Sequence, residues 1–404
     1  MSITQAVILA AGEGTRMHPL TYTRPKVMLP IANKPILEHL LIEMHKNGIK
    51  DFIFVVGYHD EQIRDYFRSG EKWQVNIQYR KQNKQLGTAD ALRMVEGLVA
   101  GNFLMANGDS IVSSEDINNL IQRTGNVLSI IEKQDVSGLG VIEARDNLIV
   151  RIHEKSERPA SHLANAGLYL FTPDIFEAIE KTVKSPRGEF EITDSINLMI
   201  NSGKPVAYMV ITRWFDFSYP WDLLTANESM LTELRLSHER AEIEENVIMK
   251  GIVSIGKNTV VKSGSYIVGP VIIGGGCEIG PNCYIRPGSA IGDRCHIGAS
   301  VEVKNSIIMA GSKVPHLNYV GDSIIGENCN LGAGTKIANL RIDKQIIRVA
   351  GIDTKRRKLG AIIGDKVETG INASINTGTL IGNNTLIGPG VLAHGVIPPG
   401  SKII

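Results

Sequence analysis

The first 230 residues alternate short apolar runs with amphipathic stretches. We predict buried strands at four of the runs, AVILAA (6–11), FIFVVG (52–57), FLMAN (103–107) and LYLF (168–171). Helices are predicted between them at ILEHLLIEMHKNG (36–48) and TADALRMVEGLVA (88–100). This alternation indicates a Rossmann-like α/β domain with a mostly parallel sheet, whose ligand lies beyond the carboxyl ends of the strands.

From Val253 onward, apolar positions recur every six residues, as in VSIGKN TVVKSG SYIVGP VIIGGG CEIGPN CYIRPG SAIGDR CHIGAS. The first position of each hexad is usually small, and the third is aliphatic. The third positions are Ile255, Val261, Ile267, Ile273, Ile279, Ile285, Ile291, Ile297, Val303 and Met309. Such hexads are typical of a left-handed parallel β-helix, in which three hexads close one triangular coil and stacked coils share a core.

Two interruptions break the hexads. The phase slips at KVPHLNYVGD (313–322), and residues 341–360 show no hexad pattern at all. This second stretch predicts a protruding insertion, either a solvated flap or an anion clamp, and its charge alone favours the flap. Its seven basic residues are Arg341, Lys344, Arg348, Lys355, Arg356, Arg357 and Lys358, against two acids, Asp343 and Asp353.

The length of 404 residues predicts more than one domain. We expect an α/β domain over 1–230, a charged helical linker over 231–245 and a β-helix over 246–404 with the insertion at 341–360. The balance of 43 Lys+Arg against 42 Asp+Glu argues against nucleic acid or a lipid surface as the main partner. No basic, apolar leader or run of about 18 apolar residues occurs, so we expect a cytoplasmic protein.

All four cysteines, Cys277, Cys283, Cys295 and Cys329, occupy the small first position of a hexad. Their spacings match no zinc pattern. Cys277 and Cys295 would stack in adjacent coils within reach of a disulfide, but in a cytoplasmic protein we expect them to stay reduced and structural.

The loop after the first predicted strand is suited to an anion. Gly12 and Gly14 would let the backbone N–H groups of Ala11 to Thr15 turn toward one point, and Arg16 adds a planar cation suited to phosphate. The loop matches neither G-x-G-x-x-G, because Met17 stands at the third glycine, nor a Walker loop. By itself the pattern is equally compatible with a plain turn.

Four further groups follow predicted strands or lie near them. Lys26 comes after a proline, the amides of Gln82 and Gln85 precede a Gly87-Thr88 turn, Asp109 follows FLMAN, and Asp216 lies among aromatic residues. Amides suit the edge of a pyrimidine, which offers donors and acceptors. Each residue alone also has an ordinary structural explanation, namely a surface charge, a loop amide, a turn residue or a strand-end cap.

Together these motifs carry a resemblance. LAAGEGTRM, RPKVMLP, QLGTADA and NGD resemble the sugar-1-phosphate nucleotidylyltransferases. HLNYVGDSIIGENCNLGAGTKIANL resembles the acetyltransferase half of the bifunctional N-acetylglucosamine-1-phosphate uridylyltransferases, in their archaeal form. The resemblance implies an in-line attack of a sugar 1-phosphate on the α-phosphorus of UTP or dTTP, with release of pyrophosphate.

For the first half, the resemblance implies roles residue by residue. Arg16 and Lys26 would be catalytic, and Asp109 with Asp216 would hold Mg²⁺. The family often has W-x-D-x-G-x-P, and Ser218 replaces that glycine here, which puts Asp216 in doubt. The nucleotide would be bound by Leu9, Ala11, Gly12, Gly14, Thr15, Gln82, Gln85, Gly87 and Thr88. The sugar would be bound by Gly140, Glu154, Lys155 and Asn165.

For the second half, the resemblance implies that His316 is the general base for transfer of an acetyl group from acetyl-CoA to an amino-sugar 1-phosphate, a task suited to an imidazole at neutral pH. Arg286, Lys304, Tyr319 and Asn330 would bind the sugar phosphate. Asn339 would orient the acetyl group, and Lys358 would add an anion contact. The family resemblance also implies a homotrimer formed through the β-helix.

Three hypotheses follow. The first is the bifunctional enzyme. The second is a nucleotidyltransferase whose β-helix is only an oligomerisation scaffold, which would have no need of His316, Tyr319 and Asn339. The third is a regulatory subunit without catalysis, against which Arg16, Lys26 and Asp109 argue. The sequence leaves open glucosamine versus galactosamine, and UTP versus dTTP.

Overall fold

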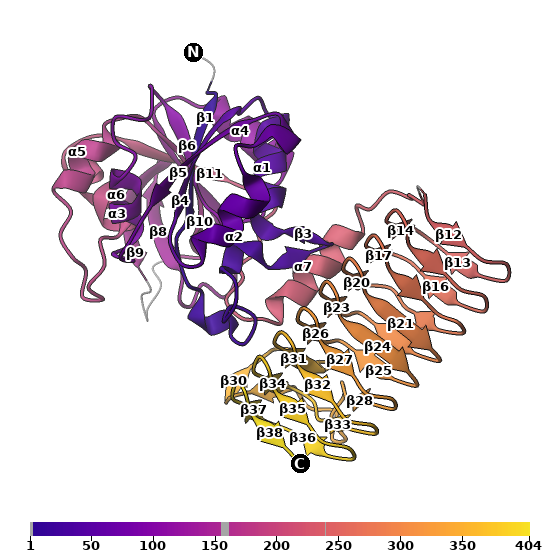
Figure 1. Cartoon of the computed structure of the whole chain (residues 1–404). Coiled ribbons are helices and arrows are strands. Elements are labelled where there is room, and N and C mark those ends of the chain that lie inside the picture. The colour runs from indigo at the N-terminus through magenta and orange to yellow at the C-terminus, as the bar shows by residue number, and fades with distance from the viewer. Residues whose placement is uncertain (1–2, 155–160, 239) are drawn as a thin grey trace. The chain divides into compact units, whose positions relative to one another are not determined.

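The apolar run that opens the chain forms β1 (Gln5–Ala10), which pairs in parallel with β4 (Asp51–Val56) and β6 (Phe103–Asn107) (Figure 1). Its side chains alternate between two buried layers, Ile8 in one and Val7 in the other. A strand that is buried on both faces explains the continuous apolar sequence. This computed structural model describes residues 3–154, 161–238 and 240–404.

The chain divides into two compact units. The first comprises Met1–Glu13, Arg24–Met28 and Pro35–Asp216. The second comprises Gly14–Thr23, Leu29–Lys34 and Phe217–Ile404.

The first unit is a sheet with helices packed on both faces (Figure 1). The strand order is β5 (Asn76–Lys81), β4, β1, β6, β10 (Leu163–Phe171), β7 (Asn126–Glu132), β11 (Val206–Val210), β9 (Leu148–Glu154) and β8 (Gly140–Arg145). The helices are α1 (Ile36–Lys46), α2 (Asp60–Phe67), α3 (Thr88–Arg93), α4 (Ser114–Ile121), α5 (Ile175–Glu180) and α6 (Ile192–Asn201), with short 3-10 turns at Lys26–Met28 and Glu71–Trp73.

Predicted elements are present, with differences in extent. The sequence LYLF is the end of the longer strand β10, which runs antiparallel to β6 and β7, so the sheet is mixed. Strands β5, β4, β1 and β6 form one parallel part, and β7 and β11 also pair in parallel. Helix α3 ends at Arg93, well before the predicted end at residue 100. Gly97, with a φ of 77°, lies in this lost stretch, and glycine disfavours a helix interior.

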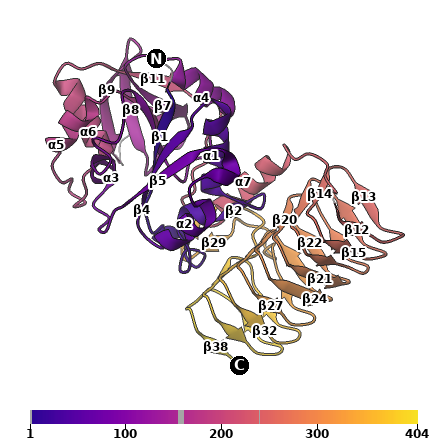
Figure 2. The ribbon, with the colours of Figure 1, turned by 45° about the horizontal axis from the view of Figure 1, so that its top comes forward.

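The second unit is the left-handed parallel β-helix, whose coils are visible from β14 to β38 in Figure 2. Strands of successive coils stack into three parallel sheets. The β14 sheet contains β14 (Val253–Ile255), β17 (Val271–Ile273), β20 (Ser289–Ile291), β23 (Ile307–Ile308), β26 (Ile324–Ile325), β31 (Ala361–Ile363), β34 (Thr379–Ile381) and β37 (Val396–Ile397).

The other two sheets are built in the same way. The β12 sheet contains β12 (Glu242–Ile243), β15 (Val260–Val261), β18 (Glu278–Ile279), β21 (His296–Ala299), β24 (Lys313–His316), β27 (Asn330–Leu331), β32 (Glu368–Thr369), β35 (Leu386–Ile387) and β38 (Lys402–Ile403). The β13 sheet contains β13 (Ile248–Lys250), β16 (Tyr266–Val268), β19 (Tyr284–Ile285), β22 (Glu302–Lys304), β25 (Tyr319–Gly321), β28 (Lys336–Ile337), β33 (Ser374–Ile375) and β36 (Leu392–Ala393).

The third hexad position points into one continuous core, as predicted. A fully buried aliphatic side chain of this kind contributes about 1.5–3 kcal/mol. The four cysteines are free and buried beside this core, as expected of structural thiols. Burial raises the pKa of Cys295 and of Cys329 to about 12.

The slip in the hexads is divided between two places, and only the second begins within the predicted segment 313–322. From Ile255 to Ile337, inward positions are six residues apart except at two places, where Val303 is followed by Ile308 and Val320 by Ile325. Ile308, and not Met309, therefore fills the core position. Both five-residue steps occur at the corner that leads from the β13 sheet to the β14 sheet, hereafter the short corner. Asn305 tightens the first of these steps with a positive φ of 44°.

This register corrects the predicted place of His316. His316 ends β24, where the inward spacing is a regular six residues from Ile308 through Val314 to Val320. The histidine is exposed and lies in a regular strand, so no slip sets it apart from the repeat.

The insertion at 341–360 leaves the coil at the same short corner, after β28. It contains a hairpin of β29 (Arg348–Val349) and β30 (Ile352–Asp353). Ile347 and Val349 are buried, and a Cβ added to Gly378 would lie 2.8 Å from Ile347. The expectation of a solvated flap holds for the charged side chains, which are largely exposed, but apolar side chains pack the insertion against the next coil.

The predicted helical linker was also wrong. Helix α7 (Asp222–Leu231) ends where the linker was expected to begin, and the described residues from there to β12 contain no helix. The second unit further contains a 3-10 turn at Thr15–Met17 and the strand β2 (Pro30–Ile31), while β3 (Lys34–Pro35) pairs with β2.

Candidate functional site

The carboxyl ends of the parallel strands β1, β4, β5 and β6 meet at one edge of the first unit, as the sequence predicted. Gly108 N donates to Leu9 O at 2.8 Å, and Tyr58 N donates to Ala11 O at 3.1 Å. The side-chain nitrogen of Gln85 also donates to Ala11 O, at 3.0 Å. The backbone of Leu9 and Ala11 thus joins the segments that follow the neighbouring strands.

Two glycines that sequence reasoning missed make this approach possible. A Cβ on Gly57 would lie 2.8 Å from Ala11 O, and a Cβ on Gly108 would lie 2.9 Å from Leu9 O. Their place directly after or near a strand end was the available signal.

The two glycines of the opening loop differ. Gly12 does not have a positive φ, and a Cβ there would meet nothing within 4 Å, so its surroundings are open. Gly14 has a φ of 72° and begins the 3-10 turn that carries Thr15 and Arg16. Within the second unit, the guanidinium of Arg16 lies 6.0 Å from the ring centroid of Tyr219. Only Gly14 needs glycine for its backbone angles.

Lys26 and Asp109 form an ion pair, with Lys26 Nζ 2.5 Å from Asp109 Oδ2. An isolated antiparallel bridge between Ile111 and Phe215 places Asp216 on the segment that runs beside the one carrying Asp109. The structure therefore brings both predicted carboxylates to adjacent segments of the same unit.

These carboxylates suit a hard divalent cation such as Mg²⁺, which is bound through one or two carboxylates while phosphate and water complete its ligands. Among the described residues, no group of three or more His, Cys, Asp or Glu side chains could hold a metal. Asp109 and Asp216 are the one or two carboxylates that such a cation would take from the protein.

The predicted base-binding loop is ordered by its own contacts. Gln82 is buried, and its Nε2 donates to Gly87 O at 3.2 Å. Thr88 Oγ1 accepts from Ile192 N at 2.9 Å. Gln82 and Gln85 each use the side-chain nitrogen to donate to a backbone carbonyl, so the side-chain oxygen of each is the atom that a ligand could contact.

Three of the four predicted sugar-binding residues lie together. Gly140 pairs with Glu154 across β8 and β9, and a Cβ on Gly140 would lie 3.5 Å from the Cβ of Asn165. Asn165 Nδ2 donates to Tyr169 Oη at 2.7 Å, and burial raises the pKa of Tyr169. Lys155, the fourth residue, lies outside the described residues.

Sequence reasoning missed two residues at Glu154. Thr193 Oγ1 donates to Glu154 Oε2 at 3.3 Å, and Arg187 Nη2 lies 3.5 Å from Glu154 Oε1. Arg187 also pairs with Glu191, which raises the pKa of the arginine against the effect of burial. These partners come from helix α6 and the loop before it, far from Glu154 in sequence, and no motif marks them.

In the second unit, a row of predicted residues crosses the β13 sheet. Four residues, one in each successive coil, lie on or within two residues of β19, β22, β25 and β28, namely Arg286, Lys304, Tyr319 and Asn339. A Cβ on Gly321 would lie 2.7 Å both from Tyr319 Oη and from Asn339 Nδ2, so these two side chains meet over that glycine.

Asp322, which was not predicted, holds this row together. Its Oδ2 accepts from Lys304 Nζ at 2.7 Å and from Asn339 Nδ2 at 2.5 Å, and its Oδ1 accepts from Asn305 Nδ2 at 3.0 Å. The carboxylate is buried at the short corner. Burial and the acidic neighbours Glu302 and Asp322 raise the pKa of Tyr319.

The remaining predicted residues lie apart from this row. His316 ends β24 in the β12 sheet, three residues before Tyr319, and Asn330 lies in the next strand of that sheet. Lys358 is exposed and forms an isolated bridge with Leu340 at the base of the insertion. The second unit therefore presents an imidazole one corner away from two cations, a phenol and an amide.

Comparison with known proteins accounts for both units. Residues 5–233 match the family described as nucleotidyl transferase, and residues 267–402 match the GMPPB C-terminal domain. The chain is 43% identical over 393 residues to the "Bifunctional protein GlmU" of Methanococcus maripaludis, which covers 96% of this chain and 94% of the relative. The chain belongs to the family of bifunctional GlmU proteins.

Two further relatives agree with this family. The "Bifunctional sugar-1-phosphate nucleotidylyltransferase/acetyltransferase" of Sulfurisphaera tokodaii is 41% identical over 396 residues, which is 96% of this chain and 97% of the relative. A solved UDP-glucose pyrophosphorylase, 24% identical with a TM-score of 0.52, covers 57% of this chain and all of its own, and shows the fold alone. The predicted resemblance and fold class are confirmed.

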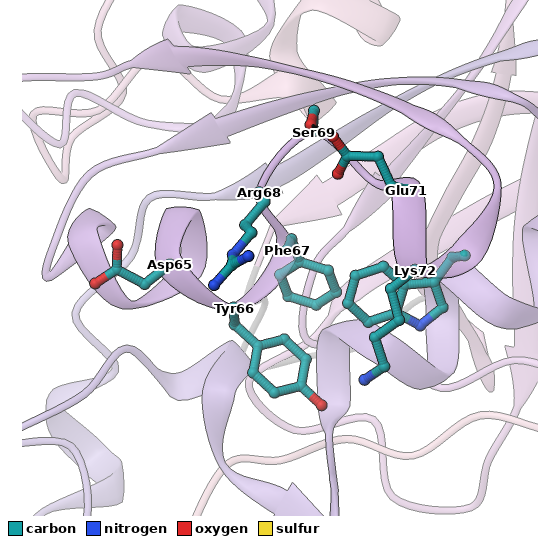
Figure 3. Close-up of a pocket in the computed structure, with 8 residues that line it drawn as sticks. Asp65, Tyr66, Phe67, Arg68, Ser69, Glu71 and Lys72 are labelled. Carbon is teal, nitrogen blue, oxygen red and sulfur yellow. Dashed lines mark hydrogen bonds between the residues drawn. The ribbon is translucent and has the colours of Figure 1, made fainter.

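The cavity in Figure 3 lies where α2 leads toward β5, and the sequence analysis did not predict a site there. It measures about 490 Å³. Lys72 Nζ lies 5.0 Å from the ring centroid of Tyr66, whose hydroxyl donates to the buried Glu38 at 2.5 Å. These side chains interact with one another, and we assign the cavity no role.

In the described part of the chain, no helix is long and apolar enough to cross a membrane.

Proposed function

We propose that the chain catalyses two reactions. The first is acetyl transfer from acetyl-CoA to an amino-sugar 1-phosphate, glucosamine or galactosamine 1-phosphate. The second is uridylyl transfer from UTP to the N-acetylated sugar 1-phosphate, which gives a UDP-N-acetylhexosamine and pyrophosphate. The observation that carries this proposal is the presence of two separate polar constellations in one chain, the Lys26–Asp109 pair and the row held by Asp322.

Nucleotidyl transfer would take place at the strand ends of the first unit. A phosphate oxygen of the sugar 1-phosphate bonds to the α-phosphorus while the bond to the β-phosphate oxygen breaks and pyrophosphate leaves. No protein nucleophile is needed, because this chemistry depends on positioning and on neutralising charge. Lys26 would neutralise the reacting phosphate, and Arg16 with the loop amides would hold the outgoing phosphates.

Asp109 and Asp216 would hold Mg²⁺ against the phosphates. A bound Mg²⁺ supplies neutralisation of negative charge on the phosphate oxygens. Glu154 and Asn165 would bind the sugar, with Arg187 and Thr193 orienting the Glu154 carboxylate.

Acetyl transfer would take place on the β-helix. The amino nitrogen bonds to the thioester carbonyl carbon, the carbon–sulfur bond breaks, and CoA leaves as the thiolate. His316 would take the proton that the nitrogen loses. Arg286 and Lys304 would bind the sugar phosphate, and Tyr319 with Asn339 would orient the reacting groups.

We further propose a homotrimer formed through the β-helix. Exposed aliphatic side chains on the β-helix strands support association of copies of this chain, among them Ile248, Leu386, Leu392 and Val396. Light scattering tests this proposal, and a monodisperse monomer with intact acetyl transfer would contradict it. The four free cysteines support a reducing, cytoplasmic location.

The alternative is a nucleotidyltransferase with the β-helix as a scaffold. A scaffold has no need of a buried carboxylate that gathers a lysine and an asparagine at a tightened corner, which favours the bifunctional proposal. Two assays on the purified chain test it, CoA release and pyrophosphate release, across a panel of sugar phosphates and nucleotides. Pyrophosphate release without any CoA release would favour the scaffold.

A further inference from the structure

Gln82 and Asp90 form a buried polar pair in the first unit, with 6% and 7% of their surfaces exposed. Gln82 Nε2 donates to Asp90 Oδ2 at 2.9 Å and to Gly87 O at 3.2 Å. A carboxylate and a carbonyl accept hydrogen bonds and cannot donate them. Both hydrogens of the Gln82 amide nitrogen therefore have acceptors, and the amide group has one favourable orientation.

Arg93 fixes the orientation and the charged form of the Asp90 carboxylate. Its Nη2 donates to Asp90 Oδ1, the oxygen that does not face Gln82. Because a guanidinium only donates, Asp90 must present acceptors on both sides, to Arg93 and to Gln82.

The Gly87 carbonyl is fixed just as firmly. Gly87 has a φ of 108°, and a Cβ there would lie 2.4 Å from Phe190 O. Phe190 N donates to Leu86 O at 2.7 Å, and Ala89 N donates to Phe190 O at 2.9 Å. The loop is clamped on both sides of Gly87, so its carbonyl cannot turn away from Gln82.

The fixed nitrogen leaves the oxygen of Gln82 for a ligand. Within the part of the chain that the structure describes, no group donates a hydrogen bond to Gln82 Oε1. An acceptor placed opposite N3 of a pyrimidine pairs with the N3–H of uracil or thymine. The same acceptor repels the N3 lone pair of cytosine.

We propose that Asp90 is a positioning residue that orients the Gln82 amide and thereby selects a nucleotide with an imide N3–H over cytosine. This inference rests on the proposed function and on the family resemblance, which implies that Gln82 binds the nucleotide. Asp90 itself touches no substrate and acts through Gln82.

The test compares UTP with CTP on the full chain. At saturating N-acetylglucosamine 1-phosphate, kcat/KM for pyrophosphate release is measured for each nucleotide in the wild type and in Asp90→Asn. The introduced amide would turn its oxygen to Arg93 and its nitrogen to Gln82, which drives the Gln82 amide to turn as well. We expect the UTP:CTP ratio to fall by about 10- to 100-fold, mainly through a higher KM for UTP.

A double-mutant cycle separates positioning from a merely structural role. In a Gln82→Met background, Asp90→Asn should leave the UTP:CTP ratio unchanged, because the group through which Asp90 acts is gone. Asp116→Asn is the matched control, since Asp116 is another buried aspartate of this unit, whose carboxylate accepts from Ser113 Oγ and Thr212 N. It should lower the melting temperature and keep the ratio.

The outcomes are distinguishable. If the wild type released no pyrophosphate from any nucleotide, the proposed function would fail. If the wild type preferred UTP and folded Asp90→Asn kept that preference, the role of Asp90 would be overturned while the function stood. If Asp90→Asn did not fold, Asp90→Ala serves in its place, with an expected fall of about five- to tenfold because Gly87 O still holds one hydrogen of the amide.

Discussion

Lys26 Nζ lies 2.5 Å from Asp109 Oδ2, which joins the segment after the opening loop to the residue that follows β6. Both side chains are partly exposed, 15% for Lys26 and 34% for Asp109. A cation and an anion that face solvent together can each exchange their partner for a phosphate oxygen or a metal ion. This pair is therefore the centre of the predictions for the first unit.

Asp109→Asn should lower pyrophosphate release by at least about 100-fold and leave CoA release unchanged, because the amide keeps the shape but loses the charge that a cation needs. Steady-state assays of both products on one preparation check this. Asp146→Asn, at an exposed turn of the same unit, is the control and should change neither rate. A parallel loss of both activities in folded Asp109→Asn would contradict the assignment of the two reactions to separate sites.

Chelation should show the same selectivity. EDTA removes the cation that neutralises phosphate charge, while acetyl transfer needs only a base and oriented donors. Pyrophosphate release should stop and return when Mg²⁺ is added in excess, whereas CoA release should continue throughout. An acetyl transfer that stops with EDTA would show that the β-helix site also depends on a metal.

Asp322→Asn should lower both the rate of acetyl transfer and the stability of the fold. The change removes the charge from a buried partner of Lys304, and breaking a buried ion pair costs about 3–5 kcal/mol. We expect a lower melting temperature and a KM for glucosamine 1-phosphate that rises by about tenfold or more. Asp343→Asn, which removes a surface partner of Arg341, should do neither. A normal KM in Asp322→Asn would separate Lys304 from sugar-phosphate binding.

The four cysteines should resist alkylation in the folded protein. Burial raises the pKa of each thiol, to about 12 for Cys295 and Cys329, so the nucleophilic thiolate is scarce at about pH 8. Mass spectrometry after iodoacetamide treatment should show no modification of the native chain and four modifications after unfolding. Rapid labelling of the native protein would contradict the buried register of the hexads.

Local periodicity explains why so much of the fold could be predicted. Each hexad specifies its own inward residue, such as Ile255 or Ile297, so the coils follow from short-range pattern alone. The position of the slip could not be predicted from this pattern. The sequence KNSIIM has two adjacent apolar residues, Ile308 and Met309, and either could fill the one core position. Only pairing with Ile291 of the preceding coil decides between them.

The sites divide in the same way. Residues in motifs, such as Lys26 and Asp109, are brought together as predicted, because parallel strands deliver their ends to one edge. Residues that position the side chains of a site from behind were not predicted. The partners of Asp322 and Asp90 are known only once the coil and the loop are folded. Polar partners that are far apart along the chain leave no periodic pattern in the sequence.

The last prediction concerns His316, which decides between the bifunctional enzyme and the scaffold. Its ring is exposed at the end of a regular strand, and the neighbouring inward residues Val314 and Val320 carry the core. His316→Ala should therefore leave the melting temperature and pyrophosphate release unchanged, while acetyl transfer falls by about 10²- to 10⁴-fold, the usual contribution of a general base. His296→Ala is the matched control and should keep both rates. His296 lies in the same β12 sheet one coil earlier, with its imidazole 3.9 Å from Glu278. A histidine that merely held its coil together would lower stability and reduce both activities in proportion. If CoA release were unchanged in folded His316→Ala, the imidazole would not be the base, and the β-helix would stand as a scaffold.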